Sequence, residues 1–444
     1  MPECLNAMNT VAKTPYKTSA VAELRSTTTI RLRANALLAR TRRGESAWFT
    51  VNDGAMATTA ARVAELTRAR YPDLTIAYHS RWRHFEAGGQ DRLGMFNQRF
   101  DQLSPRASPA ERARGHIDLA LVSVLLDAGA GAGWRYQEMN VEVGVEVGKD
   151  ASGTLAASAP HEFSRSEGLG VASFHAFMSG LFSSDAASPL QADATGLQQV
   201  TAQKLGTAFQ VTANNPLVGL EGRAALLRRL GHALQDQPEL FGPQARPGHL
   251  FDWLTQGKKT IFAHDILDVL LTRLGQIWPA QNAIESVALG DCWRHPAARS
   301  SAAGSASDGW MPFHKLSQWL TYSLLEPFQW AGIQVDGLDA LIGLPEYRNG
   351  GLFLDAGVLR LRDATQADCL HAAGDELIVE WRALTVASLD ELAPRVREQL
   401  GLTVAQMPLA CVLEGGTWAA GRVLAQQLHH GLPPLNIQSD GTVF

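Results

Sequence analysis

The sequence predicts a mainly α-helical protein with only a few short strands. Apolar side chains recur every three or four residues over long stretches, and residues that favour helix starts precede several of these stretches. The best strand candidate, residues 74–78, is short. A chain of 444 residues, 45% of them hydrophobic, can bury a large core. We therefore expect a single large, mostly helical domain over residues 18–444, preceded by a flexible arm at 1–17.

The first helices follow from periodicity and capping residues. Residues 19–43 are rich in Ala and Leu, and Asp53 can cap a helix over residues 55–70. Residues 108–111, with the sequence Ser-Pro-Ala-Glu, form a capping box with proline at the first helical position. The helix that starts there is apolar on nearly every side, which indicates that it is buried.

A run of alternating Ala and Gly at residues 128–133 follows this helix and leads into Trp134 and Tyr136. Its spacing departs from the GxGxxG pattern of dinucleotide-binding proteins, and no strand clearly precedes it. We expect the glycines to turn the backbone sharply and to present both aromatic side chains to a cavity, where they would hold a flat ring or a sugar. The alternative is that Trp134 and Tyr136 are part of the core.

The stretch from 310 to 330 is predicted to be a helix that starts near Pro312 and bends or ends at Pro327. One of its faces is apolar. A second face combines aromatic and ionisable groups at helical spacing: Lys315, Trp319, Tyr322 and Glu326. An ordinary surface helix does not place Trp and Tyr beside a lone Lys, so this face is either functional or a buried packing network.

Three chemically active side chains stand together at Glu346, Tyr347 and Arg348. Pro345 before them and the pair Gly350–Gly351 after them indicate a tight turn, where functional groups are often displayed. The loop at 296–309 is low in complexity and precedes the predicted helix at 310–330. It is either a lid over the site or a tolerated insertion.

A further helix is predicted over residues 375–392, where Glu376 and Glu380 lie four residues apart. Like charges at this spacing repel each other unless cations lie opposite, and buried charges need partners. We expect both carboxylates to face a polar cavity. Residues 408–431 form one more helix by the same periodicity.

Basic and aromatic residues alternate at 79–85, and we expect Arg83, His84 or Arg382 to contact a phosphate or ribose. The alternative is that these side chains form structural ion pairs with Glu86, Glu376 or Glu380. Metal ligands are not grouped in the sequence. His264 and Asp268 lack a third ligand nearby, as do Cys292 and His295. We therefore expect neither a metal ion nor another cofactor.

Composition excludes several classes of partner. The net charge is −5, from 39 basic and 44 acidic residues that are well mixed, so nucleic acid is not an expected partner. The four cysteines lack CxxC spacing, which suits a reducing cytosol. No leader-like segment and no apolar run of about 20 residues occurs, so we expect a cytoplasmic protein without a membrane association.

Six blocks and the C-terminal ending carry a family resemblance: residues 76–93, 117–138, 163–177, 310–333, 343–359 and 375–390, and the ending Ser439-Asp440-Gly441-Thr442-Val443-Phe444. In these blocks the chain resembles the uracil-catabolism family of fungi and bacteria, long described as a domain of unknown function. The resemblance implies a role in taking uracil to urea. It also implies association with a GTP-cyclohydrolase-II-like enzyme and the other enzymes of that route.

Three short motifs are similar to those of the queuosine-salvage N-glycoside hydrolases. Residues 314–318 resemble the family's Lys-Arg-Ala-Gln helix start, residues 345–348 its Ala-Asp-Tyr-Arg motif, and residues 380–382 its Glu-Ile-Arg motif. The family fold is mainly helical and resembles that of helical DNA glycosylases. Glu346 stands where the family has Asp, so the carboxylate of this chain reaches one methylene further.

These resemblances imply a metal-independent enzyme that cleaves the N-ribosidic bond of a uracil-derived ribosyl compound, foremost a phosphorylated ribosylurea. The alternative is a non-catalytic partner that channels intermediates for the cyclohydrolase-like enzyme. Glu346 would stabilise the positive sugar and activate water, with Lys315 opposite. The other side chains would bind the substrate or fix the turn that carries Glu346: Trp134, Tyr136, Tyr347, Arg348, Trp319, Arg83, His84, Glu376, Glu380 and Arg382.

Overall fold

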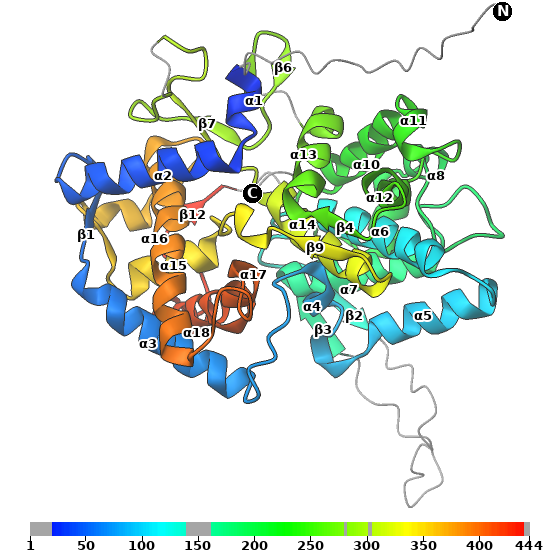
Figure 1. Ribbon diagram of the computed structural model, residues 1–444, viewed down its shortest axis with the longest axis horizontal. Coiled ribbons are helices and arrows are strands. Elements are labelled where there is room, and N and C mark those ends of the chain that lie inside the picture. The colour runs from blue at the N-terminus through cyan, green and yellow to red at the C-terminus, as the bar shows by residue number, and fades with distance from the viewer. Residues whose placement is uncertain (1–19, 139–160, 279–281, 301–303, 439–444) are drawn as a thin grey trace, which may run out of the picture.

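The computed structural model describes residues 20–138, 161–278, 282–300 and 304–438 (Figure 1). The predicted arm at 1–17 and the ending at 439–444 lie outside these ranges. Helices dominate the described chain, and its strands are two to four residues long. The prediction of a mainly α fold is therefore confirmed.

One group of helices packs around the long helix α16, which contacts α2 and α3 on one side and α15 on another. Helix α15 also packs against α18, and these elements lie together on the left of Figure 1. The members are α1 (Ala20–Leu24), α2 (Thr27–Arg42), α3 (Gly54–Arg70), α15 (Tyr347–Asp355), α16 (Glu376–Leu400), α17 (Leu409–Val412) and α18 (Trp418–His429).

The second group surrounds α6 and α14, which pack against each other. Helix α7 covers α6, and α10 packs against both α8 and α9. The members are α4 (Arg81–His84), α5 (Arg92–Leu103), α6 (Pro109–Leu125), α7 (Arg165–Met178), α8 (Ala194–Gln198), α9 (Ala202–Ala208), α10 (Leu220–Gln235), α11 (Pro238–Phe241), α12 (Leu250–Thr255), α13 (Ala263–Arg273) and α14 (Lys315–Trp330).

The described strands form two-stranded pairs that join distant segments. The antiparallel pairs are β1 (Phe49–Val51) with β10 (Leu359–Leu361), β2 (Arg135–Glu138) with β3 (His161–Ser164), β5 (Ala283–Ile284) with β6 (Val287–Ala288), and β7 (Cys292–Arg294) with β8 (Trp310–Pro312). The parallel pairs are β4 (Thr260–Phe262) with β9 (Gln334–Asp336), and β11 (Leu370–His371) with β12 (Asn436–Ile437). Residues 74–78 form no strand, contrary to our expectation.

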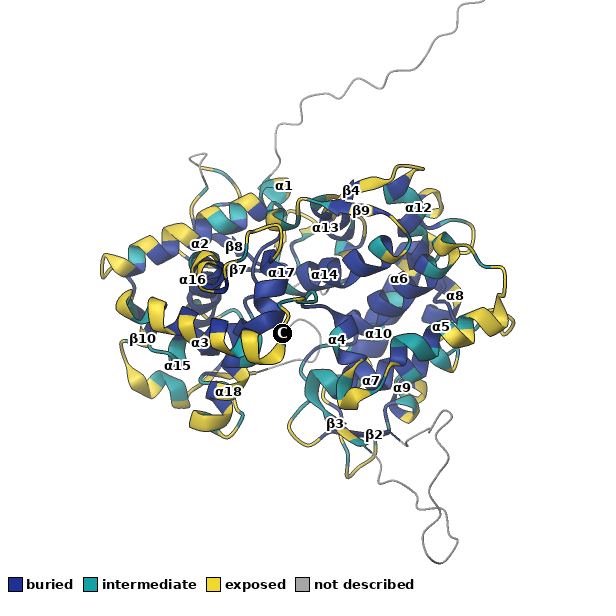
Figure 2. Cartoon of the chain, turned by 60° about the horizontal axis from the view of Figure 1, so that its bottom comes forward, coloured by how far each residue is buried: buried dark blue, intermediate teal, exposed yellow. Residues whose placement is uncertain are grey.

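One large cluster of buried apolar side chains runs through both groups of helices, and a small second cluster contains Leu24, Leu289, Cys292 and Trp310. Helix α14 lies at the centre of the large cluster and is buried along nearly its whole length, whereas α2 and α3 turn exposed faces outward (Figure 2). Of the predicted stripe, Trp319, Tyr322 and Glu326 are thus buried, whereas Lys315 at the start of the helix is partly exposed. Among the described helices, none has both the length and the apolar character that crossing a membrane requires.

The predicted helix starts are partly confirmed. Ser108 and Glu111 form the expected capping box at the start of α6, with Pro109 in the first turn. Asp53 precedes α3 as predicted, but its carboxylate makes no cap and pairs with Arg42 instead.

Helix α14 begins later than predicted, because residues 310–312 form strand β8 and the helix starts at Lys315. Pro327 lies inside the helix, which continues to Trp330. Proline cannot donate to the carbonyl four residues earlier, that of Ser323. The indole N–H of Trp82 donates to this carbonyl instead, at 2.8 Å. The Ser323 carbonyl therefore keeps a hydrogen bond although Pro327 cannot provide one.

Gly350 and Gly351 do not form the predicted turn but lie inside α15. A Cβ at Gly350 would come within 2.7 Å of the Trp381 ring, so the missing side chain lets α15 approach α16 closely. Residues 301–303 of the predicted loop at 296–309 lie outside the described ranges. Near the end of this loop, Ser307 is held against α2, because the Arg33 guanidinium donates to its carbonyl and hydroxyl at 2.8 and 2.9 Å.

Candidate functional site

A cavity of about 290 Å³ lies where the two groups of helices meet. Its walls come from the starts of α7, α14 and α15, from the glycine run after α6, and from the segment after α18. The lining residues are Asp127, Ala128, Gly129, Ala130, Gly131, Ala132, Arg165, Ser166, Lys315, Glu346, Tyr347, Leu432, Pro433, Asn436 and Ile437. The structure thus brings Lys315, Glu346 and Tyr347 together from two separate helices.

Glu346 is the N-cap residue of α15. Its backbone is extended, and its two carboxylate oxygens accept hydrogen bonds from the backbone N–H groups of Arg348 and Asn349, each at 2.6 Å. Burial raises the pKa of Glu346 above its ordinary value of 4.5, although these two hydrogen bonds and the charge of Lys315 oppose the rise. The carboxylate is therefore fixed in orientation and is more basic than an exposed glutamate.

Lys315 is the first residue of α14 and faces the same cavity. Burial lowers the pKa of its ammonium group, whereas the charges of Asp127 and Glu346 oppose this effect. Its backbone N–H donates to the carboxylate of Asp291 at 2.9 Å, which fixes the start of the helix. The preceding residue, His314, has a left-handed φ of 50°, a conformation that is costly for a non-glycine residue.

Asp127 is a second carboxylate in the cavity. The hydroxyl of Ser166 donates to it at 2.7 Å, and the buried guanidinium of Arg81 pairs with it at 3.0 Å. Arg81 in turn stacks on the Trp319 ring at 4.7 Å, and His84 meets the same ring edge-on with centroids 5.5 Å apart. Trp319 and His84 thus hold Arg81, which in turn pairs with Asp127. We expected both side chains to contact the substrate, but they pack against Arg81 instead.

Arg382 connects the segment before Glu346 to the start of α14, which carries Lys315. Its guanidinium forms two hydrogen bonds of 2.7 Å with Asp291, and it also donates to the carbonyl of Pro345 at 3.2 Å. Asp291 holds the start of α14, and Pro345 directly precedes Glu346. Arg382 therefore positions both Lys315 and Glu346, and these contacts replace the phosphate or ribose contact that the sequence suggested.

Comparison with known proteins places the sequence in a family. A family model described as "Protein of unknown function (DUF1688)" matches residues 23–444. The chain belongs to this family. Protein urg3 of Schizosaccharomyces pombe is 38% identical over 434 residues, which cover 96% of this chain and 100% of that protein. Uracil catabolism protein 4 of Lachancea kluyveri is 36% identical over 397 residues, 83% of this chain and 85% of that protein. The predicted family is therefore confirmed.

In this DUF1688 member the aromatic pair after the glycine run does not line the cavity. Trp134 is fully buried, stacks on Phe209 and donates its indole N–H to the Phe209 carbonyl at 3.0 Å. Tyr136 stacks on His175. The glycine run itself forms a wall of the cavity, so the prediction located the segment but not the side chains that face the cavity.

Arg83 forms ion pairs in place of the predicted phosphate contact. Its guanidinium lies 2.8 Å from Glu86 and 2.8 Å from Glu326. Glu86 is one of the partners that the structural alternative named. Glu326, from the polar stripe of α14, also accepts a hydrogen bond from Ser80 at 2.6 Å.

Glu376 and Glu380 lie away from the cavity, next to His295, and the ligand atoms of these three residues are within 4.8 Å of one another. That spacing could hold a cation. Glu380, however, already accepts a hydrogen bond from Ser46, lies 3.1 Å from the His295 ring nitrogen, and has Arg40 at 3.8 Å. These contacts compensate the buried carboxylate without an ion.

Sequence reasoning missed the cavity residues Asp127, Arg165 and Ser166, and also the wall after α18. Asp127 had a usable signal, because it is a carboxylate placed between a buried apolar helix and a glycine run. Arg165 has a left-handed φ of 54°, which no residue-type rule assigns to arginine. Its position depends on the β2–β3 pair, in which Arg135 lies opposite Ser164.

Proposed function

We propose that the protein is a hydrolase of uracil catabolism that cleaves the N-ribosidic bond of a uracil-derived ribosyl compound, with a ribosylurea as the leading substrate. Similarity to the relative named Uracil catabolism protein 4 supports the pathway. The observation that carries the chemistry is that Glu346 and Lys315 line the same cavity, each with a perturbed pKa.

In the proposed reaction, water adds to C1 of the ribose while the bond from C1 to nitrogen breaks. Positive charge builds on the sugar, and the ionised Glu346 stabilises it and takes a proton from the water. The departing nitrogen takes a proton from the Lys315 ammonium. The products are urea and the free sugar, and proton transfer from Glu346 to Lys315 restores both groups.

Asp127 has a supporting part in this proposal. Its negative charge favours the protonated form of Lys315 and so opposes the effect of burial. Arg81 and Ser166 hold its oxygens in place. A carboxylate fixed in this way is also suited to accept hydrogen bonds from ribose hydroxyls.

The test is to incubate the purified protein with ribosylurea, uridine and their 5′-phosphates, and to assay free urea, uracil, ammonia and sugar. We expect urea and sugar to form in equal amounts from a ribosylurea. Ammonia in place of urea would identify an amide-cleaving enzyme instead. No release from any substrate would contradict the proposal and favour a non-catalytic partner of the cyclohydrolase-like enzyme.

The two pKa shifts predict a bell-shaped dependence of kcat/KM on pH. Activity should fall as the pH drops through the raised pKa of Glu346, so this limb should lie above its ordinary value of 4.5. Activity should also fall as the pH rises through the lowered pKa of Lys315, below its ordinary value of 10.5. In Lys315→Met the alkaline limb should disappear. An unchanged alkaline limb in that variant would assign it to another group.

A further inference from the structure

A second cavity, of about 270 Å³, adjoins the candidate site. It shares Arg165, Ser166 and Tyr347 with the cavity that contains Glu346, so the two cavities are neighbours. Its remaining walls come from β2, from the start of α15 and from α18 and the turn after it. We call this second space the basic cavity.

Four arginines line the basic cavity: Arg135, Arg165, Arg348 and Arg422. Among the described residues of its walls there is a single carboxylate, that of Glu167, which pairs with Arg422 at 2.7 Å. Arg135 has a partner in Glu162, at 3.6 Å. The remaining two guanidinium groups, of Arg165 and Arg348, bond to one neutral acceptor, the carbonyl of Gly431, at 2.8 and 3.2 Å.

Arg348 is the most informative of these side chains. It is 5% exposed, and its Nη1 is buried without a hydrogen-bond partner in the described part of the structure. Burial lowers the pKa of Arg348, and the positive charges of Arg165 and Arg422 lower it further, whereas the charges of Tyr347 and Glu346 oppose this effect. Since arginine remains protonated in proteins, this cluster of positive charge is stabilised when an anion binds.

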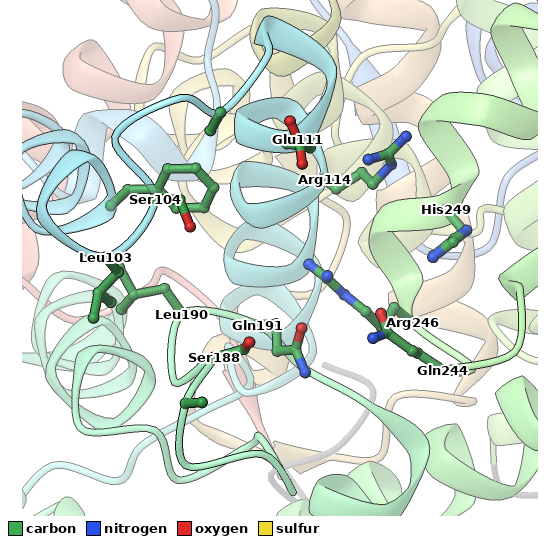
Figure 3. A pocket seen from close by; sticks show the side chains of 13 residues that line it. Leu103, Ser104, Glu111, Arg114, Ser188, Leu190, Gln191, Gln244, Arg246 and His249 are labelled. Carbon is green, nitrogen blue, oxygen red and sulfur yellow. The ribbon is translucent and has the colours of Figure 1, made fainter.

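Arginines that line another cavity of the protein have carboxylate partners, unlike Arg165 and Arg348. A cavity of about 390 Å³ is lined by Arg114 and Arg246 (Figure 3). Asp252 pairs with Arg114 at 2.7 Å, and Asp118 pairs with Arg246 at 2.6 Å. Carboxylates of the protein thus neutralise both guanidinium groups there, whereas Arg165 and Arg348 have no such partner among the described residues.

We propose that the basic cavity binds a phosphate monoester, so that the ribosyl substrate carries a phosphate while its C1 lies at Glu346. This inference rests on the proposed function for the identity of the sugar. Arg348 and Arg165 would bind the phosphate oxygens through planar guanidinium groups, and the first turn of α7 adds the positive end of a helix dipole at Ser166. Arg348 then has a role beyond fixing the turn that carries Glu346, which is the role that motif similarity indicated.

The test compares equilibrium binding of ribose 5-phosphate and ribose to the full chain by calorimetry. We expect the phosphate ester to bind at least about tenfold more tightly, because charge-assisted hydrogen bonds to phosphate are strong. Arg348→Gln should remove most of this preference. Arg422→Gln, at a more exposed position, should reduce the preference for the phosphate ester less. This variant tests the site if Arg348→Gln does not fold. The matched control is Arg395→Gln, an exposed arginine of α16.

Equal affinity for the two sugars, or an undiminished preference in both cavity variants, would overturn the phosphate site. A preference that both variants reduce would support it even if no ribosyl compound is hydrolysed. The hydrolase proposal and the phosphate site can therefore be contradicted independently. Hydrolysis of a ribosyl compound without a preference for the phosphate ester would contradict the phosphate site alone.

Discussion

Replacing Glu346 with glutamine is expected to lower turnover by a factor on the order of 10² or more, while substrate still binds. The amide keeps the size of the side chain, and its oxygen can still accept one N–H group of α15. It cannot carry the negative charge that stabilises the sugar cation or accept the proton of water. The measurement is kcat and KM for urea release, together with the thermal midpoint of each variant.

Two further variants make this result specific. Glu398→Gln makes the same chemical change at an exposed site on α16 and should leave kcat unchanged. Glu346→Asp keeps the charge but shortens its reach, so it should retain more activity than the glutamine variant. If Glu346→Gln folds normally and turns over at a near-native rate, Glu346 is not the catalytic carboxylate, and Asp127 becomes the candidate.

Asp291→Asn is expected to destabilise the protein by about 3–5 kcal/mol, because removing one partner strands the other charge of a buried ion pair. The variant weakens the two bonds to Arg382 and the bond from the Lys315 backbone. Chemical denaturation measures this loss. Asp265→Asn, at an exposed site in α13, is the control and should change the free energy of unfolding by less than about 0.5 kcal/mol.

The pH dependence provides a second check on Asp291. Burial raises its pKa, but the charge and hydrogen bonds of Arg382 outweigh burial and hold the pKa at about 2, below the ordinary value of 3.8. Because the folded pKa is the lower one, the stabilisation is present above pH 3.8 and is lost as the pH falls toward 2. Additive effects of Asp291→Asn and Arg382→Met would contradict the coupling of the two residues.

The sequence was sufficient to predict the helical fold and the segments that form the cavity. It was less successful in predicting which side chains of those segments face the cavity. Local signals sufficed for the capping box at Ser108, since a cap depends on residues within one turn. Lys315 and Glu346 were predicted together through motif similarity, although 31 positions separate them (346 − 315). Their shared cavity depends on Asp291 and Arg382, a pair that no local pattern indicates.

Errors came where tertiary contacts override local preference. Gly350 indicated a turn, but the close approach of Trp381 places it in a helix. Trp134 after a glycine run suggested a cavity wall, but a hydrogen bond to the Phe209 carbonyl and the stacked Phe209 ring hold it in the core. The phosphate contact was expected near Arg83 because basic and aromatic residues alternate there. Arg83 instead pairs with Glu86, three residues away, and with Glu326 on the distant helix α14.

The central claim is that the bond between ribose and nitrogen breaks, and the fate of a carbon label tests it most directly. Ribosylurea and its 5′-phosphate would be labelled with ¹³C at the ureido carbonyl. Each substrate would be incubated with the wild-type protein and with Glu346→Gln, and the label followed by NMR. The account predicts that all converted label appears as urea, with an equal amount of free sugar, and that Glu346→Gln slows this conversion. Label that appears as carbonate, with release of ammonia, would contradict it.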